Sequence, residues 1–119
     1  MKNILHIIFT IFLLTACSSD GNVEYIDSNP IEGIWIGQLR GIDQMFVFND
    51  NNIFEWWQKS SSGDWIKTYS SKYNLTKDKV YLSEYSSIDM IYGGLINYRI
   101  DDKILILTNK SEVRCIRKY

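Results

Sequence analysis

The sequence predicts an all-β domain, a small antiparallel up-and-down barrel of about eight strands, with a β-sandwich as the alternative architecture. Three observations predict it. Segments rich in Ile, Val, Phe, Tyr and Trp recur along residues 30–119, short polar turns separate them, and no segment repeats apolar residues at the helical period. These residues suffice for one modest core. A closed barrel would leave such short strands without exposed edges.

The expected strands follow one another with tight connections. They cover residues 33–40, 43–49, 52–59, 64–74, 79–85, 87–92, 95–101, 103–109 and 112–118. The connections carry residues that favour tight reversals. They are Asn49–Asn52, Ser60–Asp64, Lys77–Lys79, Gly93–Gly94, Asp101–Lys103 and Asn109–Ser111. We expect Gly93–Gly94 to be a hairpin turn, because the helix that a phosphate-binding glycine loop needs does not follow it.

An apolar run precedes the domain. Lys2 is followed by apolar residues from Ile4 to Leu14 and then by Thr15, Ala16 and Cys17. At 1.5 Å per residue the run reaches only about 16 Å, half of a bilayer core of about 30 Å, so it is too short for a spanning helix. A charged start, a short apolar segment and small residues at a cut site indicate a secretory signal peptide.

The stretch Leu14-Thr15-Ala16-Cys17 resembles the processing box of bacterial lipoproteins. The resemblance implies cleavage before Cys17 and acyl chains on Cys17 that attach the protein to a membrane of the cell envelope, expected to be the outer membrane, on its periplasmic or outer side. We therefore expect a signal peptide over 1–16, a lipidated cysteine with a flexible tether over 17–29, and one domain over 30–119. The alternative is an ordinary signal peptide cut near Ala16, with Cys17 incidental.

Several kinds of site are excluded once residues 1–16 are removed. His6, the only histidine, goes with them, so no Ser-His-Asp or Cys-His nucleophile and no histidine-based zinc site remains. With Cys17 acylated, Cys115 is the only free thiol, and we expect it to be buried as a small apolar side chain. The 13 basic and 14 acidic residues of the full chain are dispersed, which argues against a nucleic-acid partner.

Carboxylates are the remaining catalytic groups. Those within or beside the expected strands are Glu55, Glu84, Asp89 and Asp101. Their spacing does not require two facing acids, as glycoside hydrolysis would, and no Asp-x-Asp-x-Asp calcium loop occurs. We expect no catalysis, no cofactor and no metal.

The segment Pro30–Trp35 resembles the Gly-x-Trp opening of the lipocalin family, with Gly33 and Trp35 at the matching positions. The stretches 46–54, 73–82 and 98–107 are similar to the small lipocalin-like domains of bacterial lipoproteins. The resemblance covers residues 31–118 and implies that Trp35 packs across the barrel floor under a basic residue, Arg114 or Arg117. The domain is shorter than a full lipocalin and lacks the Thr-Asp-Tyr element, so a large ligand cavity is not implied.

Adjacent tryptophans mark the third expected strand. Successive strand residues point to opposite faces, so Trp56 is predicted to face the interior and Trp57 the solvent, with Glu55 beside it. Pairing residues 52–59 with 64–71 puts Trp57 opposite Ile66. The two would form an exposed apolar patch for a partner protein or a sugar ring. The alternative is an ordinary surface aromatic side chain.

Large aromatic residues are also expected inside the barrel. Those that would line a cavity, if one exists, are Phe54, Trp56, Tyr73 and Tyr98. So many rings in a small barrel favour a filled interior. The predicted function is a lipid-anchored binding module of the envelope that contacts a protein or glycan, and the alternative is a carrier of a small hydrophobic ligand. A carboxylate enzyme and an inhibitor or immunity-type lipoprotein are the remaining hypotheses.

Overall fold

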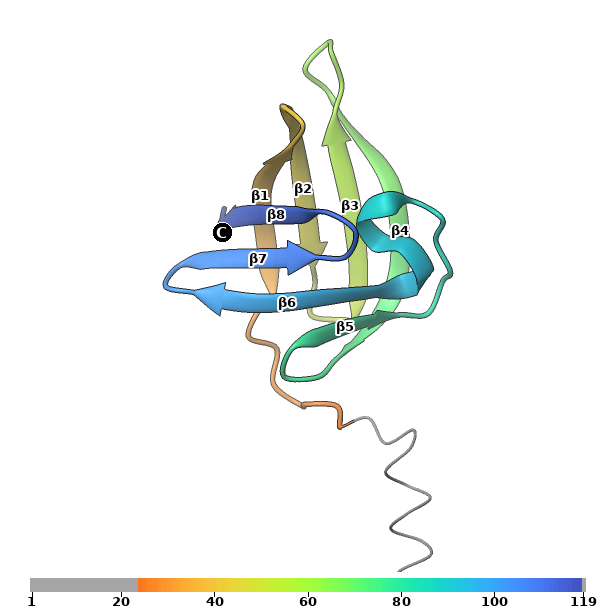
Figure 1. Cartoon of the computed structure of the whole chain (residues 1–119), viewed down its shortest axis with the longest axis vertical. Coiled ribbons are helices and arrows are strands. Elements are labelled where there is room, and N and C mark those ends of the chain that lie inside the picture. The colour runs from red at the N-terminus through yellow and green to blue at the C-terminus, as the bar shows by residue number, and fades with distance from the viewer. Residues whose placement is uncertain (1–23, 119) are drawn as a thin grey trace, which may run out of the picture.

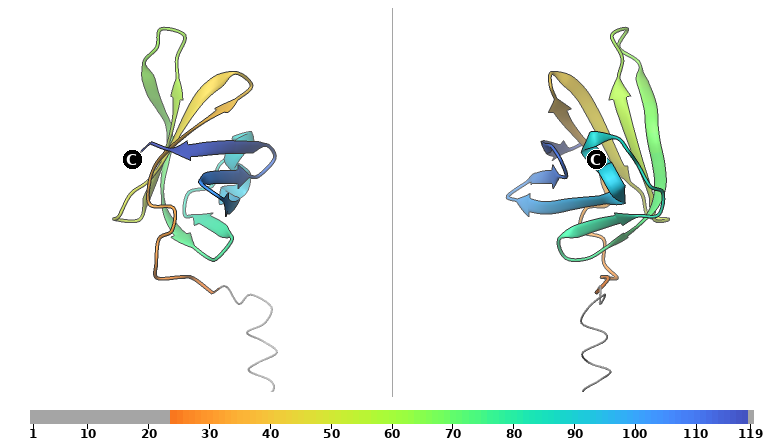
Figure 2. Two further views of the ribbon diagram at one scale, coloured as in Figure 1. Left: turned by 90° about the vertical axis from the view of Figure 1, so that its left-hand side faces the viewer. Right: turned by 45° about the vertical axis from the view of Figure 1, so that its right-hand side comes forward.

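The computed structural model describes residues 24–118, so Cys17 and the expected signal peptide lie outside the described residues. Eight antiparallel strands form one closed barrel in chain order (Figures 1 and 2). They are β1 Gly33–Leu39, β2 Ile42–Phe48, β3 Ile53–Lys59, β4 Trp65–Leu75, β5 Lys79–Leu82, β6 Leu95–Asp101, β7 Ile104–Thr108 and β8 Glu112–Arg117. The predicted up-and-down barrel is confirmed, and the sandwich alternative is wrong.

The segment expected as a strand over 87–92 is instead a 3₁₀ helix, η1, over Asp89–Gly94. Ile91 is fully buried and Ile88 packs against the same core, and a helical turn lets residues three apart reach one side. Gly93, at φ 80°, therefore does not form the expected hairpin turn, because no strand precedes it. Within residues 24–118, no helix is long and apolar enough to cross a bilayer.

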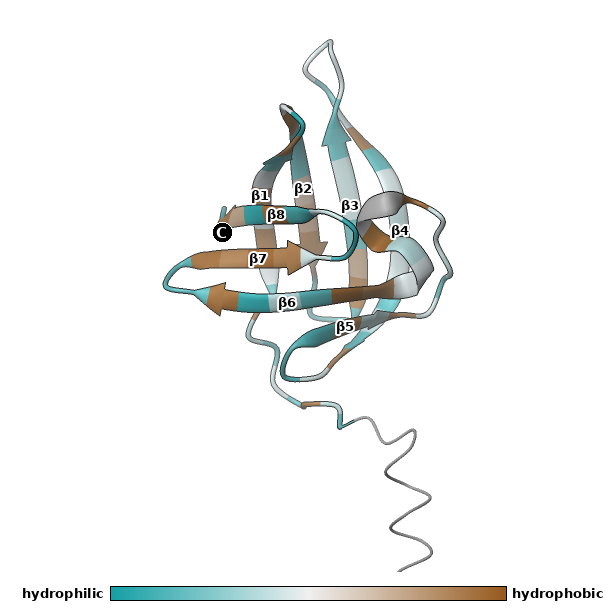
Figure 3. Ribbon diagram, in the orientation of Figure 1, coloured by the Kyte–Doolittle hydropathy of each residue, from teal (hydrophilic) through white to brown (hydrophobic). Residues whose placement is uncertain are grey.

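Aromatic rings fill the barrel between β2, β3 and β4. The ring centroid of Phe46 lies 6.1 Å from that of Trp56, and the rings of Phe48 and Phe54 are 5.0 Å apart. Tyr73 meets Phe48 edge-on at 5.5 Å. On the opposite wall, β7 is apolar along almost its whole length (Figure 3). These side chains bury apolar surface that stabilises the fold by about 25 cal/mol per Å².

One end of the barrel is closed by Trp35 and Arg117. The guanidinium carbon of Arg117 lies 4.3 Å from the ring centroid of Trp35, and the indole nitrogen donates to the carbonyl oxygen of Ile31 at 2.9 Å. Arg117 also donates to the carbonyl oxygens of Pro30 and Glu32. Arg117 is thus the basic residue over Trp35. Arg114 instead pairs with Glu112, with 3.2 Å between Nε and Oε2.

The barrel closes along a short seam between its first and last strands. β1 and β8 pair at only three positions, Trp35, Ile36 and Gly37 of β1. A Cβ atom on Gly37 would lie 2.7 Å from the carbonyl oxygen of Arg114 and 2.9 Å from the sulfur of Cys115. Only glycine allows the two backbones to approach this closely without a shift.

The residues before β1, Glu24–Glu32, run along the same closed end; we call them the N-terminal segment (Figure 1). The amide of Ile26 donates to the carbonyl oxygen of Leu75 at 2.8 Å. The side-chain amide of Asn29 donates to the hydroxyl of Tyr73 at 2.6 Å, and that hydroxyl donates to the carbonyl oxygen of Asn49 at 3.0 Å. The segment is therefore attached to β4 at two points.

Candidate functional site

The register of the β3–β4 hairpin differs from the predicted one. Trp57 pairs with Lys67, not with Ile66, and Trp56 pairs with Tyr69, not with Lys67. The connecting turn takes five residues rather than four, since the amide of Ser60 donates to the carbonyl oxygen of Asp64 at 2.8 Å. A β-bulge between Trp56 and Trp57 adds a further shift. The predicted pairing is wrong for these two reasons.

The two tryptophans nevertheless face the predicted sides. Trp56 is 2% exposed inside the barrel, where its indole nitrogen donates to Oε1 of buried Gln44 at 2.7 Å. Trp57 is only partly buried. Ile66 is 55% exposed, but it pairs with Gln58, the neighbour of Trp57. Because neighbouring strand residues point to opposite faces, Ile66 and Trp57 do not form the single patch that the sequence predicted.

Trp57 instead belongs to a row of apolar side chains on the outside of four adjoining strands. Met45 pairs with Trp57, Ile36 with Met45, and Ile116 with Ile36, so β3, β2, β1 and β8 each contribute one residue. We call Ile116, Ile36, Met45 and Trp57 the outer row. Ile116 is 63% exposed and the other three are partly buried. Directly paired residues lie about 4.5–5.5 Å apart at Cβ, so the row is continuous.

Charged groups fix the Trp57 end of the row. The indole nitrogen donates to Oε1 of Glu55 at 2.9 Å, and Lys67 Nζ lies 5.7 Å from the ring centroid. The same ammonium is 3.9 Å from Oε2 of Glu55. The hydrogen bond and the cation hold the indole in one orientation, while the other end of the row is aliphatic.

A shallow groove adjoins the row at the β1–β8 seam. Its volume is about 630 Å³, and it is lined by Ile36, Gly37, Gln38, Asp43, Glu112, Arg114 and Ile116. Ile36 and Ile116 belong to the outer row, so the groove continues it. The charges nearby are internally paired, with Arg114 on Glu112 and Gln38 donating to Asp43 at 2.8 Å.

The four side chains considered as a cavity lining are packed into the core. Phe54, Trp56, Tyr73 and Tyr98 are 0–6% exposed and belong to one buried cluster. The hydroxyl of Tyr98 donates to the carbonyl oxygen of Thr76 at 2.6 Å. Burial raises the pKa of Tyr73 and of Tyr98 above the ordinary value of 10.0. The polar atoms of this cluster are already bonded within the chain.

Chemically reactive groups are scarce among residues 24–118. Cys115 is fully buried, as expected, and burial raises the pKa of its thiol from 9.0 to about 12. That part of the chain contains no group of three or more His, Cys, Asp or Glu residues placed to hold a metal ion. Of the four carboxylates considered for catalysis, Glu55 is held by Trp57 and Lys67.

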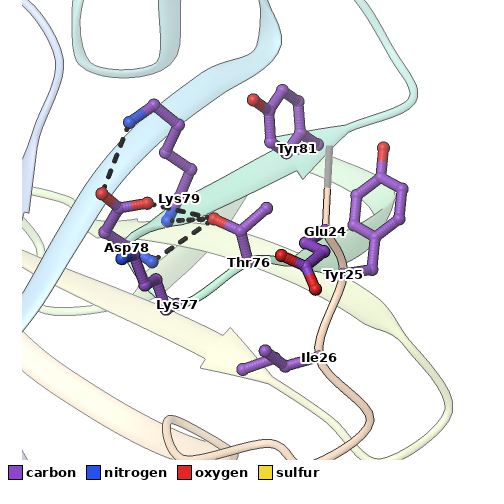
Figure 4. Close-up of a pocket in the computed structure, with 8 residues that line it drawn as sticks. All are labelled: Glu24, Tyr25, Ile26, Thr76, Lys77, Asp78, Lys79 and Tyr81. Atoms are coloured by element: carbon purple, nitrogen blue, oxygen red, sulfur yellow. Dashed lines mark hydrogen bonds and ion pairs between the residues drawn. The ribbon is translucent and has the colours of Figure 1, made fainter. Parts of the chain in front are cut away.

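A second pocket, of about 420 Å³, lies where the N-terminal segment passes the β4–β5 turn, and we call it the end pocket (Figure 4). The lining residues are Glu24, Tyr25, Ile26, Thr76, Lys77, Asp78, Lys79 and Tyr81. Sequence reasoning missed this pocket because its two walls are some 50 residues apart in the chain and residues 17–29 were expected to form a tether. Sequence reasoning also missed Ile36, Met45 and Ile116. Each of them is next in sequence to a residue that points into the barrel, so strand alternation could have assigned it to the outside.

No family model matches the chain, and no curated protein matches its sequence. Among solved structures, the chain is similar to a lipocalin lipoprotein affecting virulence in Streptococcus pneumoniae, with 12% sequence identity and a TM-score of 0.50. The match covers 79% of this chain and 100% of the streptococcal chain. At this identity the likeness supports the fold alone: an eight-stranded, lipocalin-like antiparallel barrel.

Proposed function

We propose that the protein is a non-catalytic binding module of the bacterial envelope, held to a membrane by acyl chains on Cys17, whose outer row contacts a partner protein. The observation that carries the proposal is an apolar row on the outside of a barrel whose interior is filled. The resemblance of Leu14–Cys17 to a lipoprotein processing box supports both the anchor and a location of the domain in the cell envelope.

The composition of the outer row favours a protein partner over a glycan. A sugar ring stacks on an aromatic face, but three of the four residues are aliphatic or Met and offer only apolar contact. The adjoining groove widens the surface, and partly buried apolar residues beside charged ones are typical of protein interfaces. Trp57, the large aromatic side chain at the end of the row, is the expected energetic centre.

The alternative, a carrier of a small hydrophobic ligand, needs space that the rings of Phe46, Phe54 and Trp56 occupy. Those residues are 0–2% exposed and lie about 6 Å apart from centroid to centroid. A ligand in the barrel would have to displace them, at a cost of several kcal/mol of core packing, on the order of a large-to-small core substitution. Native mass spectra that show a stoichiometric apolar adduct other than a membrane phospholipid would favour the carrier instead.

The proposal is tested with the full lipidated chain in intact cells. A photo-crosslinking amino acid at Met45 is expected to capture one discrete protein, and the same group at the exposed Asn97 of β6 is not. Trp57→Ala should reduce the Met45 crosslink at least tenfold, since truncating an interface centre costs about 2 kcal/mol or more.

Ile66→Ala serves as the matched control, because it removes an exposed apolar side chain from the other face of the same hairpin. It should leave the crosslink unchanged, and both variants should unfold at the same temperature as the parent within a few degrees. A Met45 crosslink that survives Trp57→Ala, or that Ile66→Ala removes equally, contradicts the proposed surface.

A further inference from the structure

The end pocket is built by two parts of the chain that the fold fixes against each other. Ile26 of the N-terminal segment is bonded to Leu75, at the end of β4, by its amide. The opposite wall is the β4–β5 turn, where the hydroxyl of Thr76 accepts from the amide of Lys79 at 2.9 Å and donates to Asp78 Oδ1 at 3.2 Å. Hydrogen bonds therefore hold the turn wall and the Ile26 end of the segment wall.

We propose that the end pocket binds the headgroup of a phospholipid that carries both a phosphate and a primary ammonium, as in phosphatidylethanolamine, in the membrane leaflet that holds the Cys17 anchor. The inference rests on the anchor in the proposed function. It does not involve the outer row.

The charges of the pocket match a zwitterion. Two lysines, Lys77 and Lys79, and two carboxylates, Glu24 and Asp78, line it (Figure 4). Lys79 Nζ lies 3.6 Å from Asp78 Oδ2, whereas Glu24 and Lys77 form no ion pair with each other or with other residues in 24–118. Lys77 is thus available to a phosphate and Glu24 to an ammonium group. Balanced charge distinguishes the site from a polybasic patch, which attracts anionic lipids in general.

The aromatic residues of the pocket suit the membrane interface. Tyr25 is 52% exposed, and its ring meets that of Tyr81 edge-on, with centroids 5.9 Å apart. Figure 4 shows the two rings at one side of the pocket and the lysines with Asp78 at the other. Tyrosine is enriched at the headgroup level of bilayers, because the ring is apolar and the hydroxyl is polar.

The short separation between Cys17 and the end pocket favours a membrane lipid as the ligand. Cys17 and Glu24 are seven residues apart in the sequence, so they lie at most about 25 Å from each other. Glu24 itself lines the pocket. An acylated Cys17 thus lets the pocket reach the headgroup layer of the same membrane. The effective concentration of phospholipid there exceeds that of any dissolved phosphate ester.

The test uses the full lipidated protein in nanodiscs that contain equal parts of phosphatidylethanolamine, phosphatidylcholine and phosphatidylglycerol. Native mass spectra of the released protein are expected to show one retained phosphatidylethanolamine in at least fivefold preference over the other two. Glu24→Gln with Asp78→Asn should abolish the preference, because the ammonium group loses its acceptors' charge. Asp101→Asn with Asp102→Asn is the matched control and should keep it.

Equal retention of all three lipids, or a preference that survives the Glu24 and Asp78 changes, overturns the inference. No retained lipid on a chain whose mass shows acylated Cys17 also overturns it but leaves the anchor and the partner surface intact. A mass without acyl chains refutes the anchor itself. The Met45 crosslink reports on the outer row independently, so failure of each part is recognisable.

Discussion

At the scale of single residues, each buried polar group of the barrel has a partner within the chain. Trp56 bonds to Gln44, Trp35 to Ile31 and Tyr98 to Thr76. Among the described residues, no buried side-chain nitrogen or oxygen lacks a hydrogen bond. An unsatisfied buried polar group costs about 1–3 kcal/mol. The buried side chains of residues 24–118 therefore offer a ligand no free nitrogen or oxygen, and the thiol in this part of the chain is buried as well.

That thiol, Cys115, is predicted to make stability depend on alkaline pH. The folded chain keeps the thiol proton to about pH 12, whereas the unfolded chain loses it above its ordinary pKa of 9.0. The unfolded state then binds fewer protons, so the free energy of unfolding falls as pH rises from 9 to 12, by about 1–4 kcal/mol. The raised pKa values of Tyr73 and Tyr98 act in the same direction above pH 10.

Urea unfolding at pH 8, 9, 10 and 11 checks this prediction. Cys115→Ala should flatten the slope between pH 9 and 10, where the tyrosines contribute little, whatever its effect on stability at pH 8. An unchanged slope in that variant would show that the thiol titrates alike in both states. Iodoacetamide should also modify the folded parent far more slowly than the urea-unfolded chain, because only the thiolate reacts.

At the scale of elements, the strands were predictable because alternation and turn residues are local signals. The predicted strands over 33–40, 95–101 and 112–118 match β1, β6 and β8 within one or two residues. The β3–β4 register was not predictable, because one extra turn residue and a bulge depend on hydrogen bonds that the sequence does not display. The prediction failed over residues 87–92, where apolar residues that suit a strand lead into a 3₁₀ helix that buries Ile91 in the core.

The candidate surface was predictable in part for the same reasons. Trp57 could be assigned to the outside from its neighbours Glu55 and Lys59. Its companions could not, because Ile116 joins Ile36 across a seam between strands 80 residues apart in the chain. Local patterning determines which face a side chain takes. Only closure of the barrel determines which outward side chains become neighbours.

The seam itself yields a prediction for Gly37. Gly37→Ala should destabilise the fold by about 1–3 kcal/mol, because its Cβ would lie 2.7 Å from the carbonyl oxygen of Arg114. Hydrogen exchange should accelerate most at the amides of residues 115–117, which pair with β1. Gln38→Ala, at the exposed next position of the strand, is the control and should change exchange little. Uniform acceleration over all eight strands would contradict a local opening.

At the scale of the whole molecule, the fold separates its two candidate surfaces. The N-terminal segment leaves at one end of the barrel, whereas the β1–β2 and β3–β4 turns project from the opposite end (Figures 1 and 2). Trp57 lies two residues before the end of β3, on the side of those turns. The end pocket lies beside the departing segment. In the proposed anchoring through Cys17, the Trp57 end of the outer row points away from the bilayer.

This arrangement depends on Tyr73, whose hydroxyl joins the N-terminal segment to the barrel through Asn29 and Asn49. Tyr73→Phe should cost about 1–2 kcal/mol and should accelerate hydrogen exchange at residues 26–29. Tyr81→Phe is the matched control. The ring of Tyr81 packs against Tyr25 of the same segment, and removal of its hydroxyl should not affect those amides. Equal exchange in the two variants would show that the segment is held by other contacts.

The short seam has a consequence for the proposed export of the chain. Arg117, in the last strand, lies over the ring of Trp35, and the amide of Lys118 donates to the carbonyl oxygen of Ile34. The first strand thus has no partner on one side until residues 115–118 arrive, and contacts this distant in sequence form late. A polypeptide that passes N-terminus first through a translocation channel could not close its barrel until its last residues are released. Until then it would stay unfolded enough to pass through the channel. For such a chain, the topology alone would delay closure of the barrel until residues 115–118 have left the channel.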